Sequence, residues 1–166
     1  MCIIVTGKLK GKYEYKVPAC FALKTRSCYT GLMNFQDILK PGLEAQLTDT
    51  VTDRNTASFW GSGGLDDYAT PAMIALMEMT AFSAVNPLLP PGWSTVGTEL
   101  SIRHIAATPR GMKVSAKAEL LSVNGRALSF KVEAFDEAGK IGEGTHGRFI
   151  VENEKFIAKV ESKKSL

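Results

Sequence analysis

Residues 68–98 contain a single charged side chain, Glu78, which lies within a long apolar run. The chain is predicted to be helical from Pro71, at the first helical position, to about Val85, where Asn86-Pro87 ends the helix. On a period of about 3.6 residues, the face that carries Glu78 is otherwise apolar and also holds Ile74, Ala75, Ala81, Phe82 and Val85. A carboxylate buried there without a partner would be costly. Glu78 therefore has a function, faces a solvent-filled gap, or accepts a hydrogen bond from the backbone.

Runs in which apolar and polar residues alternate predict strands on both sides of this helix. One precedes the helix at residues 43–51, and four follow it, at residues 95–106, 112–123, 126–135 and 140–151. The pair Asn124-Gly125 between two of these runs is a hairpin signal. Alternation of this kind gives each strand one buried and one wet face, as in an antiparallel meander. The order predicts an α+β protein with the hotdog fold, in which an antiparallel β-sheet wraps around one long central helix.

The first 32 residues differ from the rest of the chain in charge and in cysteine content. Residues 1–32 hold all three cysteines and six Lys/Arg against one acidic residue, whereas the remainder holds 14 basic and 16 acidic residues. We therefore expect a loose extension or a misassigned leader at 1–32, a folded domain at 33–160 and a frayed tail at 161–166. The cysteine-free, mildly acidic domain suggests a reducing cytoplasm and argues against nucleic acid as a partner. No apolar run reaches the roughly 18–20 residues that cross a membrane.

Thr70 and His104 are the candidates to act beside Glu78. Thr70 precedes a proline, so we expect it at the N-cap, where its hydroxyl either caps the helix or lies where developing negative charge is favoured. By alternation, His104 is on the inward face of its strand, where it is either a satisfied core residue or a general base. His146, the other histidine, shares a face with Arg148 and is expected at the surface. With two histidines and no cysteine in the domain, and no glycine-rich phosphate motif, we expect no metal and no cofactor.

Several short motifs follow one another between about residues 40 and 158. They are Thr70 with Glu78, Thr95-Val-Gly-Thr98, His104-Ile-Ala-Ala-Thr-Pro109, Ala118-Glu-Leu, Asn124-Gly-Arg126, Gly142-Glu-Gly-Thr-His146 and Glu154-Lys-Phe156. As an ordered set they resemble the fluoroacetyl-CoA thioesterase family of single-domain hotdog proteins. The resemblance implies a catalytic set of Thr70, Glu78 and His104, with the Gly97 backbone holding the thioester. It also implies homodimers with active sites near the subunit interface, and leaves open whether dimers pair into tetramers.

The chain departs from the fluoroacetyl-specific pattern just ahead of the threonine. That enzyme has aromatic lid residues there, whereas this chain has Gly61-Ser-Gly-Gly-Leu65. We therefore expect an open acyl pocket that Gly64 and Leu65 line. The predicted function is hydrolysis of a small or medium acyl-CoA thioester; the alternative is a non-catalytic module that binds or senses acyl-CoA.

One geometric limit follows from the spacing of the two helical candidates. Eight helical residues rise about 12 Å, so Thr70 and Glu78 cannot touch on one straight helix. Either His104 bridges them, the chain bends at Pro71, or one of them is supplied by a partner subunit.

Overall fold

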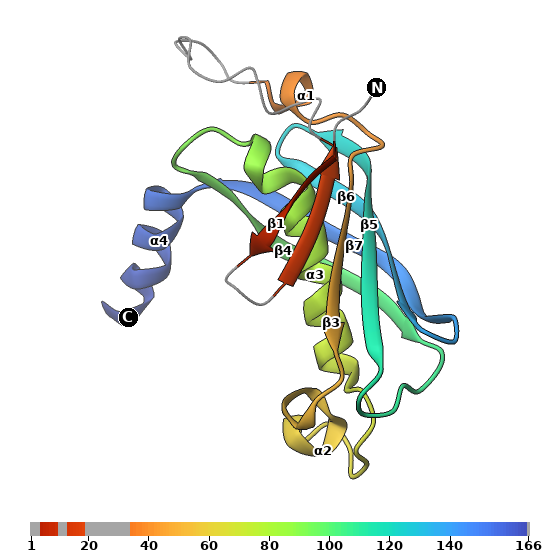
Figure 1. The fold of residues 1–166 in the computed structure, drawn as a ribbon. Coiled ribbons are helices and arrows are strands. Elements are labelled where there is room, and N and C mark those ends of the chain that lie inside the picture. Colours follow the sequence, from red (N-terminus) through yellow and green to blue (C-terminus); the bar gives the residue numbers. More distant parts are fainter. Residues whose placement is uncertain (1–3, 10–12, 19–33, 166) are drawn as a thin grey trace.

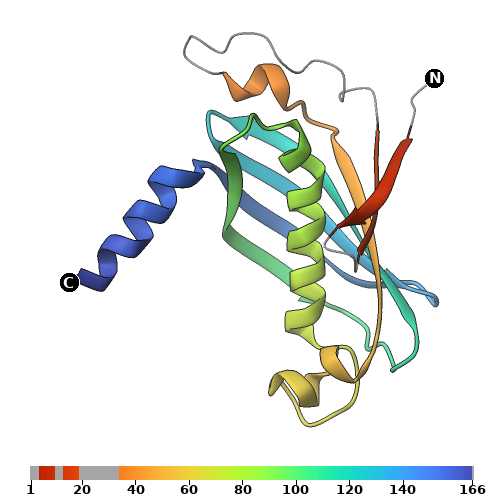
Figure 2. The same cartoon turned by 60° about the vertical axis from the view of Figure 1, so that its left-hand side comes forward.

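The computed structural model describes residues 4–9, 13–18 and 34–165. A single long helix, α3 (Thr70–Val85), lies across one face of a curved antiparallel sheet, as Figures 1 and 2 show. The sheet has the order β1-β2-β3-β5-β6-β7-β4. Its strands are β1 (Ile4–Leu9), β2 (Tyr13–Pro18), β3 (Glu44–Thr50), β4 (Trp93–His104), β5 (Lys113–Asn124), β6 (Ala127–Asp136) and β7 (Lys140–Glu152). This arrangement confirms the predicted α+β hotdog fold.

The strand order differs from a simple meander at β4. Strands β5, β6 and β7 follow one another in the sheet, but β4 lies at its edge, paired with β7 and away from β5. Alternation predicts which face of a strand is buried and does not predict its neighbours. As an edge strand, β4 is largely exposed from Gly97 to Ser101. A register shift between Gly97 and Glu99 forms a β-bulge in the middle of this strand.

The core forms where α3 packs on the concave face of the sheet. From the helix, Met73, Met77 and Ala81 are fully buried, and from the sheet, Leu47, Ala116, Phe130 and Val132 are. Complete burial of a large apolar side chain stabilises the fold by roughly 1.5–3 kcal/mol. The opposite side of α3, with Ile74, Ala75, Glu78 and Phe82, is less covered within the chain.

Short elements connect and flank this layer. They are α1 (Phe35–Ile38), the 3₁₀ turns η2 (Asp53–Asn55) and η3 (Asn86–Leu88), α2 (Ala57–Trp60), α4 (Asn153–Glu161) and η4 (Ser162–Ser165). Figures 1 and 2 show α4 projecting away from the sheet. None of the described helices is long and apolar enough to cross a membrane.

The ends of the chain bear on the predicted domain boundaries. Strands β1 and β2 form a hairpin, and β2 pairs with β3 through Glu14↔Thr48, so this part of residues 1–32 continues the sheet. Residues 1–3, 10–12 and 19–33, which complete the segment, lie outside the described residues. The extension at 1–32, the boundary at residue 33 and the frayed tail from residue 161 stay predictions.

Candidate active site

Thr70 was expected to be the N-cap of α3, but it is the first residue of the helix itself, one position after the N-cap. The N-cap is Ala69, which makes no side-chain cap, and a proline follows Thr70 in the first turn. The Thr70 hydroxyl is hydrogen-bonded instead to His104, with 2.8 Å between Oγ1 and Nδ1. Because its hydroxyl is not used as a cap, Thr70 presents its hydroxyl oxygen at the positive end of the helix dipole.

His104 is the last residue of β4 and faces the start of α3. Its Nε2 is buried and has no hydrogen-bond partner among the described residues, so Thr70 is the only group that contacts its ring nitrogens through a hydrogen bond. A hydroxyl both donates and accepts, so this bond allows Nδ1 to accept from Thr70, which is the arrangement of a general base and its proton donor. The structure thus joins two of the three predicted catalytic residues.

Glu78 lies two turns further along α3 and belongs to a different cluster. The helix is continuous from Thr70 to Val85, so it does not bend after Pro71 to bring the carboxylate back. None of the hydrogen bonds or ion pairs of the described residues joins Glu78 to Thr70 or to His104, so His104 does not bridge the two within one chain. The Glu78 side chain is 38% exposed.

The neighbours of the Glu78 carboxylate are Gly97, His146 and Arg148. Its Oε1 lies 3.7 Å from His146 Nε2. A Cβ on Gly97 would come within 2.6 Å of the same oxygen, so the carboxylate lies directly against the Gly97 backbone. The carboxylate therefore occupies the space that a side chain at position 97 would need.

His146 is fully buried, so the expectation that it lies at the surface is wrong. The reason is a bulge in β7: Ala134 pairs with Gly142 and Phe135 with Lys140, which leaves Ile141 as an extra residue. An extra residue in a strand reverses the alternation beyond it. Beyond the bulge, His146 and Arg148 therefore lie on the buried face of β7, and Phe149 lies on the exposed face.

Arg148 is buried beneath Glu78 and makes a dense set of hydrogen bonds. Its guanidinium donates to Thr95 Oγ1 (2.9 Å), to the Thr95 carbonyl (2.8 Å), to His146 Nε2 (3.0 Å) and to the Glu78 carbonyl (3.4 Å). Burial lowers the pKa of Arg148, and the nearby Glu78 charge acts in the opposite direction. The guanidinium also lies over the Phe82 ring, 5.7 Å from its centroid. This cation is thus fixed in place beside the carboxylate.

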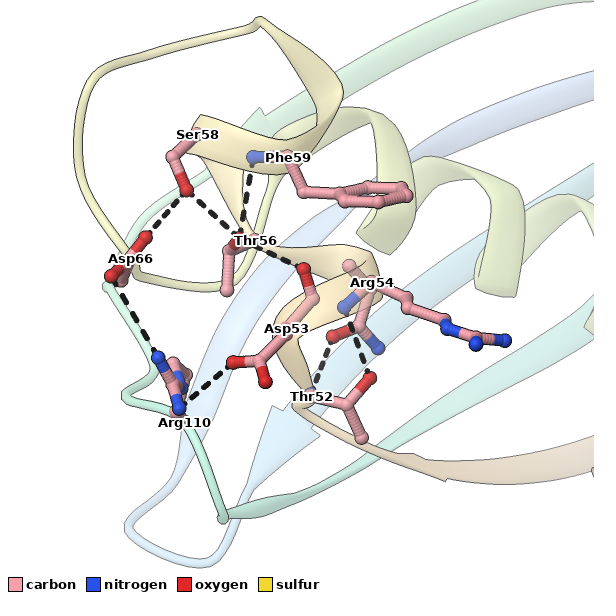
Figure 3. Close-up of polar contacts among 9 residues, drawn as sticks. Thr52, Asp53, Arg54, Thr56, Ser58, Phe59, Asp66 and Arg110 are labelled. Atoms are coloured by element: carbon pink, nitrogen blue, oxygen red, sulfur yellow. Dashed lines mark hydrogen bonds and ion pairs between the residues drawn. The ribbon is translucent and has the colours of Figure 1, made fainter.

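The segment ahead of Thr70 is a compact loop held by side-chain caps and ion pairs (Figure 3). Thr56 caps α2, and the Ser58 hydroxyl bonds the Asp66 carboxylate across the loop. Arg110 then pairs with both Asp53 (2.8 Å) and Asp66 (3.8 Å).

This loop also carries large exposed apolar side chains on either side of its glycine-rich residues. Phe59 and Trp60 of α2 are 63% and 49% exposed, and Leu65 is 73% exposed. Gly64, next to Leu65, has open space where a Cβ would be. The loop therefore offers apolar surface even though residues 61–64 contribute none.

Sequence reasoning missed the buried pair His146 and Arg148 because the bulge hides the true phase of β7. A signal was present in the glycines at 142, 144 and 147, since glycine inside a strand often marks a bulge or a close backbone approach. A Cβ on Gly144, for example, would overlap the Ser101 carbonyl of β4. In the described part of the chain, no group of three or more His, Cys, Asp or Glu side chains is placed to hold a metal ion.

Comparison with solved structures defines the class of protein. A hot-dog-like protein from Thermanaerovibrio acidaminovorans has the same fold, with a TM-score of 0.73 at 21% identity, and covers 79% of this chain and 97% of its own. A thioesterase superfamily member from Thermus thermophilus is 30% identical, with a TM-score of 0.71, and the match covers 76% of this chain and 93% of that one. The protein is a thioester hydrolase with the hotdog fold.

The chain belongs to the fluoroacetyl-CoA-specific thioesterase family, whose model matches residues 51–154. The fluoroacetyl-CoA thioesterase of Streptantibioticus cattleyicolor is 47% identical over 96 residues, which are 58% of this chain and 69% of the relative. A solved structure of a fluoroacetyl-CoA thioesterase is 37% identical, with a TM-score of 0.71, and the match covers 75% of this chain and 97% of that one.

Proposed function

We propose that this hydrolase cleaves acyl-CoA thioesters to a free acid and CoA, with Thr70 and His104 at the reacting centre. The observation that carries the proposal is the 2.8 Å hydrogen bond between Thr70 Oγ1 and His104 Nδ1 at the start of α3. A family structure, 35% identical to this chain, holds fluoroacetate and CoA, which supports a CoA ester as the substrate.

In the proposed reaction, His104 is the general base. Its Nδ1 takes a proton either from the Thr70 hydroxyl, which then attacks the thioester carbon, or from a water that Thr70 positions. The C–S bond breaks, and the proton returns to the departing thiolate. In the first route a water then hydrolyses the acyl-threonine ester, which releases the free acid and restores the Thr70 hydroxyl. Backbone N–H groups at Gly97 or at the start of α3 would hold the thioester oxygen as negative charge develops on it.

We propose that Glu78 reaches the reacting centre from a second copy of the chain. Within one copy, the helix keeps Thr70 and Glu78 about 12 Å apart along its axis. The helix face around Glu78 is incompletely covered, the edge strand β4 is exposed, and Thr70 itself is exposed. A homodimer that covers these surfaces would bring Thr70 and His104 of one copy towards Glu78 and Gly97 of the other. Light scattering would show whether the protein is a dimer or a tetramer.

We propose a small or medium acyl group that differs from fluoroacetyl. Residues 61–64 supply no side chain larger than serine for a tight pocket. Gly64 and Leu65 would line a wider entrance, and the exposed rings of Phe59 and Trp60 would add apolar surface near it. Apolar contact of this kind discriminates acyl chains by about 10–200-fold per methylene.

The decisive experiment measures thiol release from a panel of acyl-CoAs, from acetyl to palmitoyl with phenylacetyl and fluoroacetyl included. Wild type is compared with His104→Ala, with Thr70→Val, and with Thr70→Ser as the matched variant that keeps the hydroxyl. We expect turnover by wild type, partial activity of Thr70→Ser, and a loss of about 10²–10⁴-fold in His104→Ala. Binding of CoA esters without turnover by the folded wild type would refute hydrolysis of acyl-CoA and leave a binding module.

A mixing experiment tests the shared site separately. Thr70→Val and Glu78→Gln, which are each expected to be inactive alone, are unfolded together and refolded to exchange subunits. If the site combines Thr70 of one copy with Glu78 of the other, each mixed dimer regains one intact site, and the mixture recovers about a quarter of wild-type activity. No recovery from mixed dimers would place all catalytic groups in one chain.

A further inference from the structure

We propose that His146 is a positioning residue: it holds Arg148 and the Gly97–Glu99 bulge of β4 in the arrangement that places the Glu78 carboxylate against the Gly97 backbone. This inference rests on the proposed function, in which Glu78 and Gly97 belong to the reacting site. His146 itself touches no reacting atom in that mechanism. It is buried at the centre of the cluster, between the edge strand and the guanidinium.

The hydrogen bonds of His146 fix which ring nitrogen carries the proton. Nδ1 lies 2.8 Å from the Glu99 carbonyl, which can only accept, so Nδ1 must donate. Nε2 lies 3.0 Å from a guanidinium nitrogen of Arg148, which can only donate, so Nε2 must accept. Both contacts are satisfied by one species alone, the neutral ring protonated at Nδ1.

On one side, this ring anchors the bulge. The β4–β7 pairing runs from Gly97↔Arg148 to Glu99↔Gly147, so Thr98 is the extra residue. A bulge leaves its extra residue unpaired and locally disrupts the ladder. The bond from His146 Nδ1 to the Glu99 carbonyl supplies an anchor two residues from Gly97.

On the other side, the ring directs Arg148. The same guanidinium nitrogen that donates to His146 Nε2 also points at the Glu78 carbonyl. The charges that face His146 are the Arg148 cation and the Glu78 carboxylate, whose Oε1 is 3.7 Å from Nε2. Burial and the Arg148 charge lower the pKa of His146, while its bond to the Glu99 carbonyl and the Glu78 charge oppose that change. The ring is therefore kept in the neutral form that accepts from Arg148.

Two substitutions separate positioning from simple packing. His146→Gln keeps one donor and one acceptor on a side chain that can span the same gap, whereas His146→Leu keeps bulk and removes both. Val132→Ala is the control. Val132 is fully buried in β6 and is not part of the His146 cluster, so its truncation should destabilise the fold without disturbing the cluster. Each variant is assayed for kcat and KM on the best acyl-CoA of the panel and for thermal stability.

We expect kcat of His146→Leu to fall about 100-fold with KM nearly unchanged, since a displacement of about 1 Å in a site has effects of that size. The kcat of His146→Gln should be about tenfold or more above that of His146→Leu. Val132→Ala should lower the melting temperature and keep a kcat close to that of wild type. Full kcat in folded His146→Leu would overturn the proposal, and so would an equal loss of kcat in Val132→Ala at temperatures where it is folded.

A spectroscopic measurement tests the inference without activity. The chain has two histidines, so long-range ¹H–¹⁵N spectra of wild type and His104→Ala assign the His146 ring directly. We expect a protonated Nδ1 and an unprotonated Nε2 at neutral pH, and a ring that becomes charged only at a lower pH than an ordinary histidine, because burial lowers its pKa. The opposite tautomer, or a ring that is charged at neutral pH, would overturn the proposal even if His146→Leu failed to fold.

The failure of this inference is distinguishable from failure of the proposed function. Loss of activity in Glu78→Gln together with full activity in His146→Leu would overturn the positioning role alone. Full activity in Glu78→Gln would overturn the role of Glu78 in the proposed function and the positioning role with it.

Discussion

Replacing Gly97 by alanine tests the position of the Glu78 carboxylate without altering the carboxylate itself. The new Cβ would lie 2.6 Å from Glu78 Oε1 and 3.2 Å from His146 Cε1, whereas ordinary contacts begin at 3.4 Å. The carboxylate oxygen must therefore retreat by about 0.8 Å, the difference between 3.4 and 2.6 Å. The backbone itself tolerates alanine, because Gly97 is not among the glycines with positive φ in the described chain.

The displacement should affect stability and activity very differently. The atom that the new Cβ meets first, Glu78 Oε1, is the far end of a flexible side chain and not backbone, so the carboxylate can shift at a cost below about 1 kcal/mol in the free energy of unfolding. If Glu78 acts where it now lies, a shift of nearly 1 Å should lower kcat by about 100-fold. Urea denaturation measures the first effect, and thiol release from the best acyl-CoA measures the second.

A double-mutant cycle shows whether the effect passes through Glu78. Gly97→Ala, Glu78→Gln and the double variant are compared in kcat/KM. If alanine acts by moving the carboxylate, the double variant should be no slower than Glu78→Gln alone, because there is no functional carboxylate left to displace. If the two substitutions instead lower kcat/KM independently, so that the losses multiply in the double variant, Gly97 acts through its own backbone. Full activity of folded Gly97→Ala would refute the role of Glu78 at this position.

Three further predictions concern stability. Arg110→Ala should lower the free energy of unfolding by less than about 1 kcal/mol, and by less still in high salt, because the ion pairs of Arg110 are exposed; urea denaturation at low and high salt measures this. Burial lowers the pKa of His146 from 6.5, so the wild-type free energy of unfolding should fall as pH drops below about 6.5, by at most about 1.4 kcal/mol per pH unit. Urea denaturation at several pH values should give a flatter pH dependence for His146→Gln, and equal slopes for the two proteins would contradict this. Thr108→Val should lower the free energy of unfolding by roughly 1.5–3 kcal/mol at pH 7, because the buried Thr108 hydroxyl donates to Asp136 at 2.8 Å. A loss below roughly 0.5 kcal/mol in urea denaturation would contradict this.

The main elements of the fold were predictable because their patterns are long and regular. The helix α3 begins at Thr70, one residue before the predicted start at Pro71, and ends at Val85 as predicted. Each of the five strands from residue 44 onward lies within a few residues of an alternating run. What alternation lacks is the identity of each strand's neighbour, so the place of β4 at the sheet edge beside β7 did not follow from it. The pairing of β2 with β3 was missed for a different reason: residues 1–32 were expected to be a loose extension, so β2 itself was not predicted.

The contacts of the candidate site were only partly predictable from the sequence. The pairing of Thr70 with His104 follows once the helix start and the end of β4 are brought together. The burial of His146 did not follow, because one extra residue at Ile141 reverses the phase of β7 in a way that a count of apolar residues does not register. Sequence patterns report periodicity, and a bulge is a local break in periodicity whose only trace here is the cluster of glycines in β7.

The two histidines show why hydrogen-bond partners decide chemistry more firmly than residue type. His146 is held between a carbonyl that only accepts and a guanidinium that only donates. It cannot take up a proton on Nε2 without losing the bond from Arg148, so it is unsuited to act as a base. His104 has a hydroxyl as the hydrogen-bond partner of its Nδ1, and a hydroxyl both donates and accepts. The Thr70–His104 bond therefore survives a change in the charge of the ring, and His104 is the one histidine of this chain that can gain and return a proton in place.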